Sequence, residues 1–297
     1  MILLPANKPA TKHGEDGFVL VSTIWIAGLL AVVATAFAIT VRSHTLGGSN
    51  FYYNTKAEYV ADGMARQVAL TLAEPELAGI SPPANGEAVQ CNWSADVSVS
   101  VSVQDQGGLV DINTGSPDLF HSLFMALGAN TGRATALISE MEDFRDPDSV
   151  SADGSAEPIT FPSKSFGPKN APFSIVEELD QVPGMDAALL QQVLPLVTVY
   201  GQQTGIDPSV APPRLLALLA EKEAAQTSQV RFVSPTAGRT FRVDVIAELK
   251  NGARFHRAAM ISLLRQPNRP FAILEWSRVG DAEGSPPLLR GGPTCFN

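Results

Sequence analysis

The sequence lacks most of the residues and motifs on which enzyme sites depend. Its 297 residues include only two cysteines and four histidines. The cysteines do not form a C-x-x-C motif, which excludes the common dithiol redox centre. G-x-S-x-G, H-E-x-x-H, G-x-G-x-x-G and P-loop motifs are also absent, so the familiar signatures of hydrolases, metalloproteases and nucleotide-binding enzymes are missing. We therefore expect a protein that is not an enzyme.

Basic residues are scarce as well. The chain has 21 lysines and arginines against 30 aspartates and glutamates, which gives a formal net charge of −9. Binding of nucleic acid requires clustered lysine and arginine side chains that neutralise phosphates. We therefore expect no nucleic-acid partner. An acidic balance instead suits divalent cations or a surface exposed outside the cytoplasm.

One long apolar run stands near the N-terminus. The 24 residues from Phe18 to Val41 carry no charge, and as a helix they would reach about 36 Å, enough to cross a hydrocarbon core of about 30 Å. The run is longer than the core of a secretory signal, and no small-residue cleavage site follows it. Lys8 and Lys12 favour a cytoplasmic N-terminus. The sequence thus predicts a single transmembrane helix, with the residues before it on the cytoplasmic side and the residues after it on the opposite side.

Hydrophobic periodicity divides the remaining chain into strands and helices. Valines alternate with serines in the segment 96–104, which predicts a half-buried strand. Helical spacing follows, and alternation returns after position 240 with a hairpin turn at Asn251-Gly252. We expect helices at 116–128, 131–143, 174–181, 186–194 and 213–226, and an antiparallel meander of strands at 241–245, 255–264 and 271–279. Ser116 and Asp186 are the expected N-cap residues of the first and fourth helices.

The N-terminal segment resembles a known processing pattern. A short leader ends in Gly17, then Phe18 opens an unbroken apolar helix, as in type IV prepilins. The resemblance implies that prepilin peptidase cuts between Gly17 and Phe18 and methylates the new N-terminus. Most such proteins have a glutamate at the fifth mature position, where this chain has Ser22. The minor pseudopilin K subfamily of type II secretion is known for lacking that glutamate.

Short motifs in the middle of the chain resemble the same subfamily, the general secretion pathway protein K family, in content and order. They are Asp111-Ile-Asn113, Phe144-Arg145-Asp146-Pro147-Asp148, Asp153-Gly154 with Glu157, Lys169-Asn170-Ala171-Pro172-Phe173, Glu177-Glu178-Leu179 and Val182-Pro183-Gly184-Met185. The resemblance implies a minor pseudopilin at the tip of the type II secretion pseudopilus. Its partners would be the I and J minor pseudopilins, the major pseudopilin and the prepilin peptidase. It would be anchored in the inner membrane with its C-terminal domain in the periplasm. A plain membrane anchor would explain the apolar helix equally well, but the resemblance favours a helix that also packs in a filament.

These observations predict an α+β fold in which the long N-terminal helix packs on an antiparallel pilin-like sheet. A large all-α domain of the helix-hairpin-helix or SAM-like kind would be inserted into that sheet. The expected parts are a leader at 1–17, a transmembrane helix at 18–41, an amphipathic helix and first strand region at 42–108, the inserted domain at 109–228, the β meander at 229–280 and an irregular tail at 281–297.

Acidic residues gather in the segment 140–157, where prolines and glycines would form loops. Carboxylates so close together repel one another unless solvent or a cation screens them. Ca²⁺ takes about six to eight oxygen ligands from such segments, although the spacing is not that of an EF-hand. A solvated acidic loop is the alternative, and the resemblance to the K family implies Ca²⁺. The candidate ligands are Asp146, Asp148, Asp153 and Glu157, followed by Asp143.

Two further features leave alternatives open. Cys91 and Cys295 could pair in an oxidising compartment or remain unrelated thiols. The turn at 182–185 between two short helices resembles a helix-hairpin-helix, which would suit a membrane-anchored periplasmic DNA-binding protein of the competence type. Residues 174–200 contain no lysine or arginine, so phosphates would find no cationic donors there. This composition favours a small helical packing unit.

Overall fold

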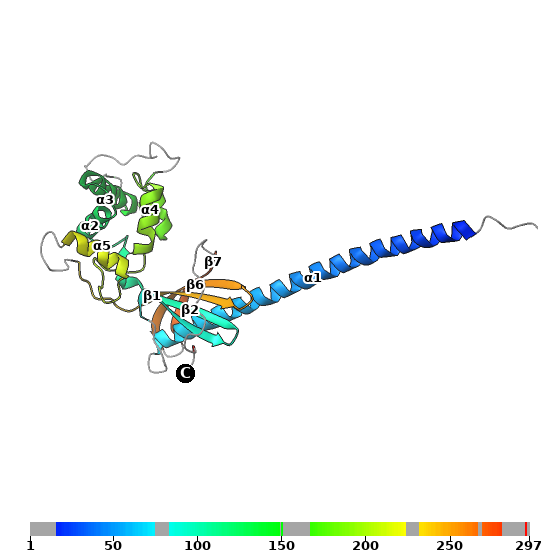
Figure 1. The fold of residues 1–297 in the computed structure, drawn as a ribbon. Helices are drawn as coiled ribbons and strands as arrows, with labels where there is room; N and C mark the ends of the chain where they lie inside the picture. The colour runs from blue at the N-terminus through cyan, green and yellow to red at the C-terminus, as the bar shows by residue number, and fades with distance from the viewer. Residues whose placement is uncertain are drawn as a thin grey trace, which may run out of the picture. The chain divides into compact units, whose positions relative to one another are not determined.

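The computed structural model describes residues 16–74, 83–148, 150, 167–223, 232–266, 269–280 and 295. The chain divides into two compact units, Met1–Thr55 and Lys56–Asn297. Helix α1, Asp16–Ala73, begins in the first unit and ends in the second (Figure 1). It includes the predicted apolar segment and continues without a break through Gly47 and Gly48, although each glycine in a helix interior costs about 1 kcal/mol.

The second unit contains a five-stranded antiparallel sheet in the order β1-β2-β5-β6-β7. The strands are β1 Asn85–Ser94, β2 Val97–Asp105, β5 Thr240–Leu249, β6 Arg254–Gln266 and β7 Arg269–Val279. The structure confirms the valine-rich strand and the C-terminal meander. It adds β1, which we did not predict because its sequence has no regular alternation of apolar and polar residues.

The last part of α1 packs on one face of this sheet. In the register of the sheet, Val101 lies opposite Val245, and Val245 lies opposite Arg257. Side chains directly opposite one another point to the same face, and Arg257 Nε donates a hydrogen bond of 2.7 Å to Asp62 Oδ1 on α1. The buried valines therefore face α1. The helix approaches them through small buried residues at four-residue spacing: Ala57, Ala61, Ala65 and Ala69.

Helices are the main secondary structure among the described residues between β2 and β5, and this segment has its own core. Its elements are η2 Gln106–Gly108, β3 Val110–Asp111, α2 Pro117–Ala126, α3 Thr131–Arg145, η3 Val176–Gln181, α4 Ala187–Val193, η4 Leu194–Leu196, β4 Val197–Thr198 and α5 Pro213–Glu223. The predicted helices are present, but 176–181 is a 3₁₀ helix. The segment is not purely helical, because β3 and β4 form a short parallel pair that we did not predict. Leu119, Phe124, Leu137, Phe144 and Leu215 are among its fully buried side chains. The expected boundaries of an inserted domain stay a prediction.

Local capping explains where the helices of this segment begin. The Ser116 side chain accepts a hydrogen bond from Leu119 N, and Pro117 occupies the first turn of α2. Asn130 caps α3 through Arg133 N in the same way. Such caps satisfy backbone donors that have no partner inside the helix. The predicted cap of α4 also forms, as described with the site below.

Hydrogen bonds and close packing join this segment to the sheet where the chain leaves β2. Asp105 Oδ1 accepts bonds from Gly107 N at 2.8 Å and from Thr236 Oγ1 at 2.9 Å. Burial raises the pKa of the Asp105 carboxyl, and these two hydrogen bonds only partly offset the rise. A Cβ atom at Gly108 would lie 2.2 Å from Val210 O, so this position requires glycine. Hydrogen bonds of the Asp105 side chain thus join the segment to the end of β2, and the close approach at Gly108 leaves no room for a side chain there.

Candidate functional site

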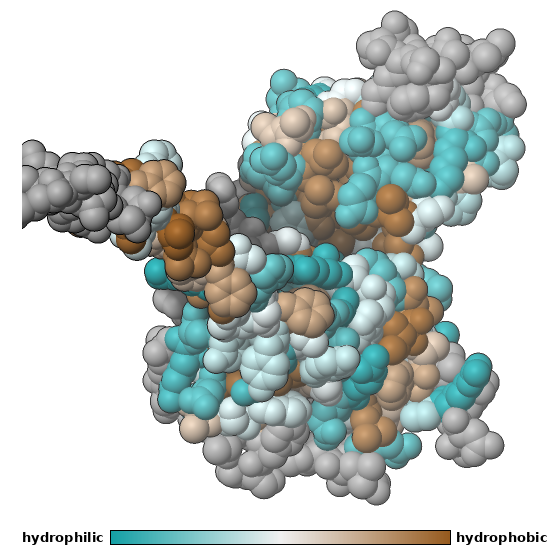
Figure 2. Space-filling model, turned by 90° about the vertical axis from the view of Figure 1, so that its right-hand side faces the viewer, coloured by the Kyte–Doolittle hydropathy of each residue, from teal (hydrophilic) through white to brown (hydrophobic). Residues whose placement is uncertain are grey.

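The apolar segment of α1 is exposed along its whole length. Phe18 and Trp25 are each 76% exposed, and Leu29 is 66% exposed. None of the residues in the most apolar stretch of this helix is buried in the protein, and the helix is long and apolar enough to cross a membrane. By contrast, the folded unit has a largely hydrophilic surface with scattered brown patches in Figure 2. A single N-terminal helix of this kind is compatible with a single-pass membrane anchor.

The predicted processing site lies at the start of α1. Gly17 and Phe18 belong to its first turn. Ser22 Oγ donates a hydrogen bond of 2.8 Å to Phe18 O, so the hydroxyl is satisfied within the helix. Ser22 brings no negative charge to this end of the chain. The structure does not test cleavage, which stays a prediction.

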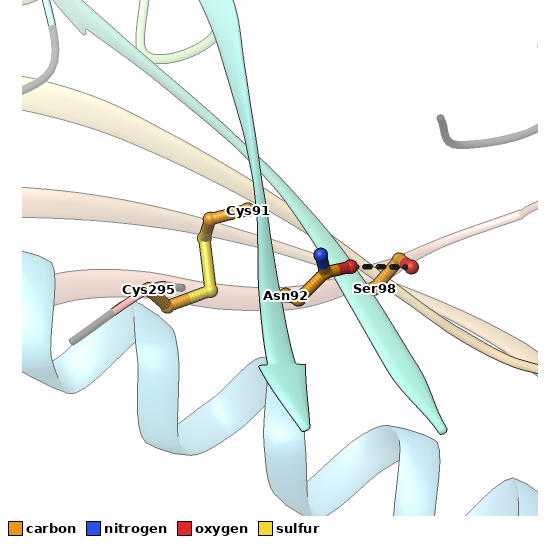
Figure 3. The surroundings of a disulfide bond; sticks show 4 residues. All are labelled: Cys91, Asn92, Ser98 and Cys295. Carbon is orange, nitrogen blue, oxygen red and sulfur yellow. Dashed lines mark hydrogen bonds between the residues drawn. A yellow bond between two sulfur atoms is a disulfide. The ribbon is translucent and has the colours of Figure 1, made fainter. Parts of the chain in front are cut away.

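The structure joins Cys91 to Cys295 by a disulfide bond, with Cα atoms 4.9 Å apart (Figure 3). Cys91 lies on β1, and its neighbour Asn92 accepts a hydrogen bond of 3.0 Å from Cys295 N through its backbone oxygen. The Asn92 side chain also accepts a bond of 3.2 Å from Ser98 Oγ on β2. Of the two alternatives left open by the sequence, the structure therefore contains the bonded form. The bond would tie the C-terminal tail to the strand β1.

The acidic segment is described only in part. Asp143 lies in α3, and Asp146 and Asp148 follow it directly. Asp153 and Glu157 lie outside the described residues. Within the described part of the chain, no three histidine, cysteine, aspartate or glutamate side chains are grouped as metal ligands. The structure thus leaves the predicted ligand set untested.

Two enclosed oxygen atoms in this region have no hydrogen-bond donor among the described residues. Asp146 Oδ1 and Asn170 Oδ1 are buried and accept no hydrogen bond from the described residues. Asn170 is held beside the acidic segment, since its Nδ2 donates to Asp148 O at 2.6 Å and its backbone N donates to Phe144 O at 2.9 Å. Burial raises the pKa of the Asp146 carboxyl, with smaller contributions from the charges of Asp148 and Asp143. Buried oxygens without hydrogen-bond donors are costly, and both are of the kind that binds Ca²⁺. We had not predicted Asn170 as a ligand.

The motif residue Asp111 organises the start of the helical segment. Its buried carboxylate accepts backbone hydrogen bonds from Asn113 N at 2.7 Å and Thr114 N at 3.0 Å on one oxygen, and from Gln202 N at 2.8 Å on the other. Asn113 in turn exchanges two hydrogen bonds with the backbone of Phe173, at 2.8 and 3.0 Å. Asp111 and Asn113 therefore join three separate parts of the chain.

Other motif residues play similar structural roles. Lys169 Nζ forms an ion pair of 2.8 Å with Glu178 Oε2, which also accepts a bond of 2.9 Å from Ser174 N. Arg145 Nη1 donates a bond of 2.6 Å to Ile112 O. Among the described residues, several of the ordered motifs are thus hydrogen-bond partners of one another.

The predicted helix hairpin has no free cation at its turn among the described residues. Gly184 adopts a positive φ of 80° there. Arg133 Nη2 donates to Gly184 O at 3.1 Å and to Asp186 Oδ2 at 2.6 Å. Asp186 caps α4 through Leu189 N, as predicted. These contacts favour the hairpin as a packing unit, because the cation that could meet a phosphate is already paired with a carboxylate.

A charged group of three residues, Arg242, Asp244 and His256, lies on the sheet. Asp244 on β5 accepts a hydrogen bond of 2.8 Å from Arg242 Nε and contacts His256 Nε2 of β6 at 2.9 Å. Burial alone would raise the pKa of Asp244, but its hydrogen bonds with His256 and Arg242 and their charges lower it overall. Sequence reasoning did not single out this group, because His256 meets Arg242 and Asp244 only when β5 and β6 pair.

Comparison with known proteins identifies the region that contains these motifs. Residues 100–202 match the family model of the type II secretion system (T2SS), protein K. The chain carries a type II secretion protein K domain. This match confirms the resemblance to the minor pseudopilin K family and supports a minor pseudopilin role. The matched region runs from β2 through the acidic segment and the helix hairpin to the loop that binds Asp111.

A solved structure resembles the fold around this protein K domain. It is a chain in the crystal structure of the GspK–GspI–GspJ complex from the enterotoxigenic Escherichia coli type 2 secretion system. The two chains are 16% identical, and the superposition covers 81% of this chain and 99% of that chain with a TM-score of 0.54. At this identity the likeness shows the fold. A comparison with curated proteins finds no match.

Proposed function

We propose that this protein is a minor pseudopilin of the K type at the tip of the type II secretion pseudopilus. It would assemble there with the I and J minor pseudopilins, above the major pseudopilin, and initiate or cap the filament during protein export across the outer membrane. The match of residues 100–202 to protein K carries this proposal. The role is structural and requires no catalytic group, in keeping with the internal pairing of the motif residues.

The N-terminal helix would serve first as an anchor and then as a filament stem. In the precursor, it would cross the inner membrane once and place the C-terminal part in the periplasm. Prepilin peptidase would remove residues 1–17 and methylate Phe18. The exposed apolar surface of α1 supports this proposal, since it has no partner among the described residues of this chain and suits first lipid and then sister helices.

Two features suit the tip in particular. Ser22 offers no carboxylate to a neighbouring subunit above, and a terminal subunit has no such neighbour. The segment between β2 and β5 adds bulk with its own core. Such bulk at a filament end would block the addition of another subunit.

Ca²⁺ is the cofactor we propose for the acidic segment. Asp146 and Asn170 would supply their enclosed oxygens, with Asp148 and Asp143 beside them. Asp153 and Glu157, outside the described residues, remain candidates. Burial, and to a smaller extent the charges of Asp148 and Asp143, raises the pKa of Asp146. A bound cation would stabilise its ionised form and would hold the end of α3 to the loop at 170.

Thermal unfolding tests the cofactor. Addition of Ca²⁺ to the full chain should raise its Tm, since a ligand at a hundredfold excess over its Kd stabilises the folded state by about 2.7 kcal/mol. Asn170→Ala and Asp146→Asn should each reduce this rise. Asp118→Asn, at an exposed acid in α2, is the matched control and should leave it unchanged. A Tm that does not move at millimolar Ca²⁺ would contradict the proposal.

Mass spectrometry of the membrane-extracted protein tests the assignment as a pseudopilin. In cells with an active prepilin peptidase, the mature chain should begin at a methylated Phe18. Gly17→Leu should retain the leader and serves as the control. Wild-type protein should also bind the I and J pseudopilins of the same system when they are produced together. Retention of the leader by the wild type, or failure to bind these partners, would argue against the proposed function.

A further inference from the structure

Three arginines and two aromatic rings alternate along the α1, β6 and β7 surface of the second unit. The Cζ atom of Arg66 on α1 lies 4.9 Å from the Trp276 ring centroid, and that of Arg257 lies 5.1 Å from the same ring. Arg257 also lies 4.9 Å from the Phe255 ring, and Arg278 lies 5.0 Å from that ring. We call these residues the arginine ladder. Its order is Arg66, Trp276, Arg257, Phe255, Arg278.

The central arginine of the ladder already binds carboxylates. Arg257 is buried, and its guanidinium pairs with Asp62 at 2.7 Å and with Glu58 at 3.4 Å, both on α1. Burial of a guanidinium requires such partners, because an unpaired buried charge is strongly destabilising. The contacts of Arg257 therefore show that an arginine of the ladder binds carboxylates.

The two outer arginines have no carboxylate partner in the part of the chain that the structure describes. Arg66 and Arg278 are both exposed, and within the described residues their contacts are those with the Trp276 and Phe255 rings. Each guanidinium is held on an aromatic ring, so its N–H donors are left available. The rings lie on the paired strands β6 and β7, and α1 is packed on that sheet, so these guanidinium positions rest on rigid elements.

A guanidinium held on an aromatic ring is preorganised to bind a carboxylate. Its coplanar N–H groups can donate two parallel hydrogen bonds to the two carboxylate oxygens, and stacking on the ring reduces the side-chain entropy that is lost on binding. A lysine would offer a charge without this geometry. The chain has a net charge of −9, so an acidic partner would be repelled elsewhere and directed to local cations such as these.

We propose that Arg66 and Arg278 bind two carboxylates of an acidic segment on a partner protein. The segment lies across the arginine ladder, and each of its carboxylates pairs with one outer guanidinium, as Asp62 pairs with Arg257. In the assembly of the proposed function, the partner is a neighbouring subunit, and this part of the inference rests on that function. The recognition chemistry itself depends only on the ladder.

An octaglutamate peptide is a direct probe. The full chain in neutral detergent at low salt should bind octaglutamate and should not bind octaglutamine. The double variant Arg66→Gln, Arg278→Gln should bind about tenfold more weakly, as expected from the loss of two partly exposed charged hydrogen bonds. Arg66→Lys, Arg278→Lys keeps the charge and should still lose most of the affinity. The control Arg214→Gln, at an exposed arginine of α5, should bind as the wild type does.

Three outcomes would overturn the inference. The first is that octaglutamate does not bind the wild type, and the second is that the glutamine and lysine variants bind it as the wild type does. The third outcome is displacement of the peptide by inorganic phosphate at lower concentration than by free glutamate, which would indicate a phosphate or lipid headgroup as the ligand. Thermal unfolding of each variant separates lost binding from lost folding, because Arg257 still joins α1 to the sheet in all of them.

Capture of the I and J pseudopilins separates this inference from the proposed function. If wild-type protein binds octaglutamate but neither pseudopilin, the proposed function fails and the receptor stands. If it binds the pseudopilins and the double glutamine variant binds them equally well, the receptor fails and the proposed function stands. A loss of capture in the double variant alone, with Arg214→Gln unaffected, supports both.

Discussion

Replacing the buried carboxylate of Asp111 by an amide should loosen the start of the helical segment. In Asp111→Asn the side chain keeps its size, but one of its two oxygens becomes an NH₂ group. If the remaining oxygen keeps the bonds from Asn113 N and Thr114 N, the NH₂ group faces Gln202 N, and two donors then oppose each other. The Gln202 N–H loses its acceptor in a region where Asp111 is only 1% exposed.

The expected cost follows from this single lost bond. A buried donor left without an acceptor costs about 1–3 kcal/mol, and this range is an upper limit for the part-buried bond from Gln202 N. Since about 1.4 kcal/mol corresponds to a factor of ten, local opening should become roughly 5- to 150-fold more frequent. Asp111→Ala removes both oxygens and all of the bonds, so its effect should be larger.

Hydrogen exchange measured by mass spectrometry is the suitable assay. Peptides that cover 197–206 and 110–116 should exchange faster by the factor given above when opening is local. Asp118→Asn removes an exposed carboxylate of α2 and should leave both peptides unchanged. Equal exchange in Asp111→Asn and wild type would refute the role that we assign to this carboxylate.

Other predictions follow from contacts elsewhere in the second unit. Gly108→Ala places a Cβ atom 2.2 Å from Val210 O and should destabilise the protein by about 1–3 kcal/mol in urea unfolding, whereas Gly280→Ala meets no atom within 4 Å and should change stability little. The pKa of Asp244 is lowered by its basic partners, so its contribution to stability is present above the usual carboxyl pKa of 3.8 and is lost as the pH falls through the lower folded value. Asp244→Asn should be less stable than wild type at neutral pH, and the difference should shrink over that acid range. Cys295→Ser should lower stability by about 2–5 kcal/mol under oxidising conditions, and reductant should lower the Tm of wild type but not of the variant.

Features that depend on neighbours in the sequence could be predicted from the sequence. The valine alternation of β2 and the side-chain caps at Ser116 and Asp186 all appear in the structure where expected. Each depends on a few adjacent residues, whose periodicity or hydrogen bonding is local. The apolar run from Phe18 to Val41 belongs to the same class, because its length and lack of charge alone make it a candidate span.

The candidate metal site could be predicted only in part. Charge density pointed to Asp146 and its acidic neighbours, since repulsion between nearby carboxylates can be read from the sequence. It could not show that one oxygen of Asp146 is enclosed, or that Asn170 brings a second enclosed oxygen to the same region. Both facts depend on how the chain after the acidic segment returns to the end of α3.

The long apolar helix, the main strands and helices, and the family to which residues 100–202 are related could all be read from the amino-acid sequence. The remaining features depend on contacts between distant parts of the chain. The polar strand β1 forms because β2 supplies its hydrogen-bond partners, and the β3–β4 pair forms because distant segments meet. The arginine ladder was also beyond prediction, since Arg66 is separated by most of the chain from Arg278. Contacts between distant residues depend on the packing of the whole unit, so they cannot be predicted from short-range periodicity in the sequence.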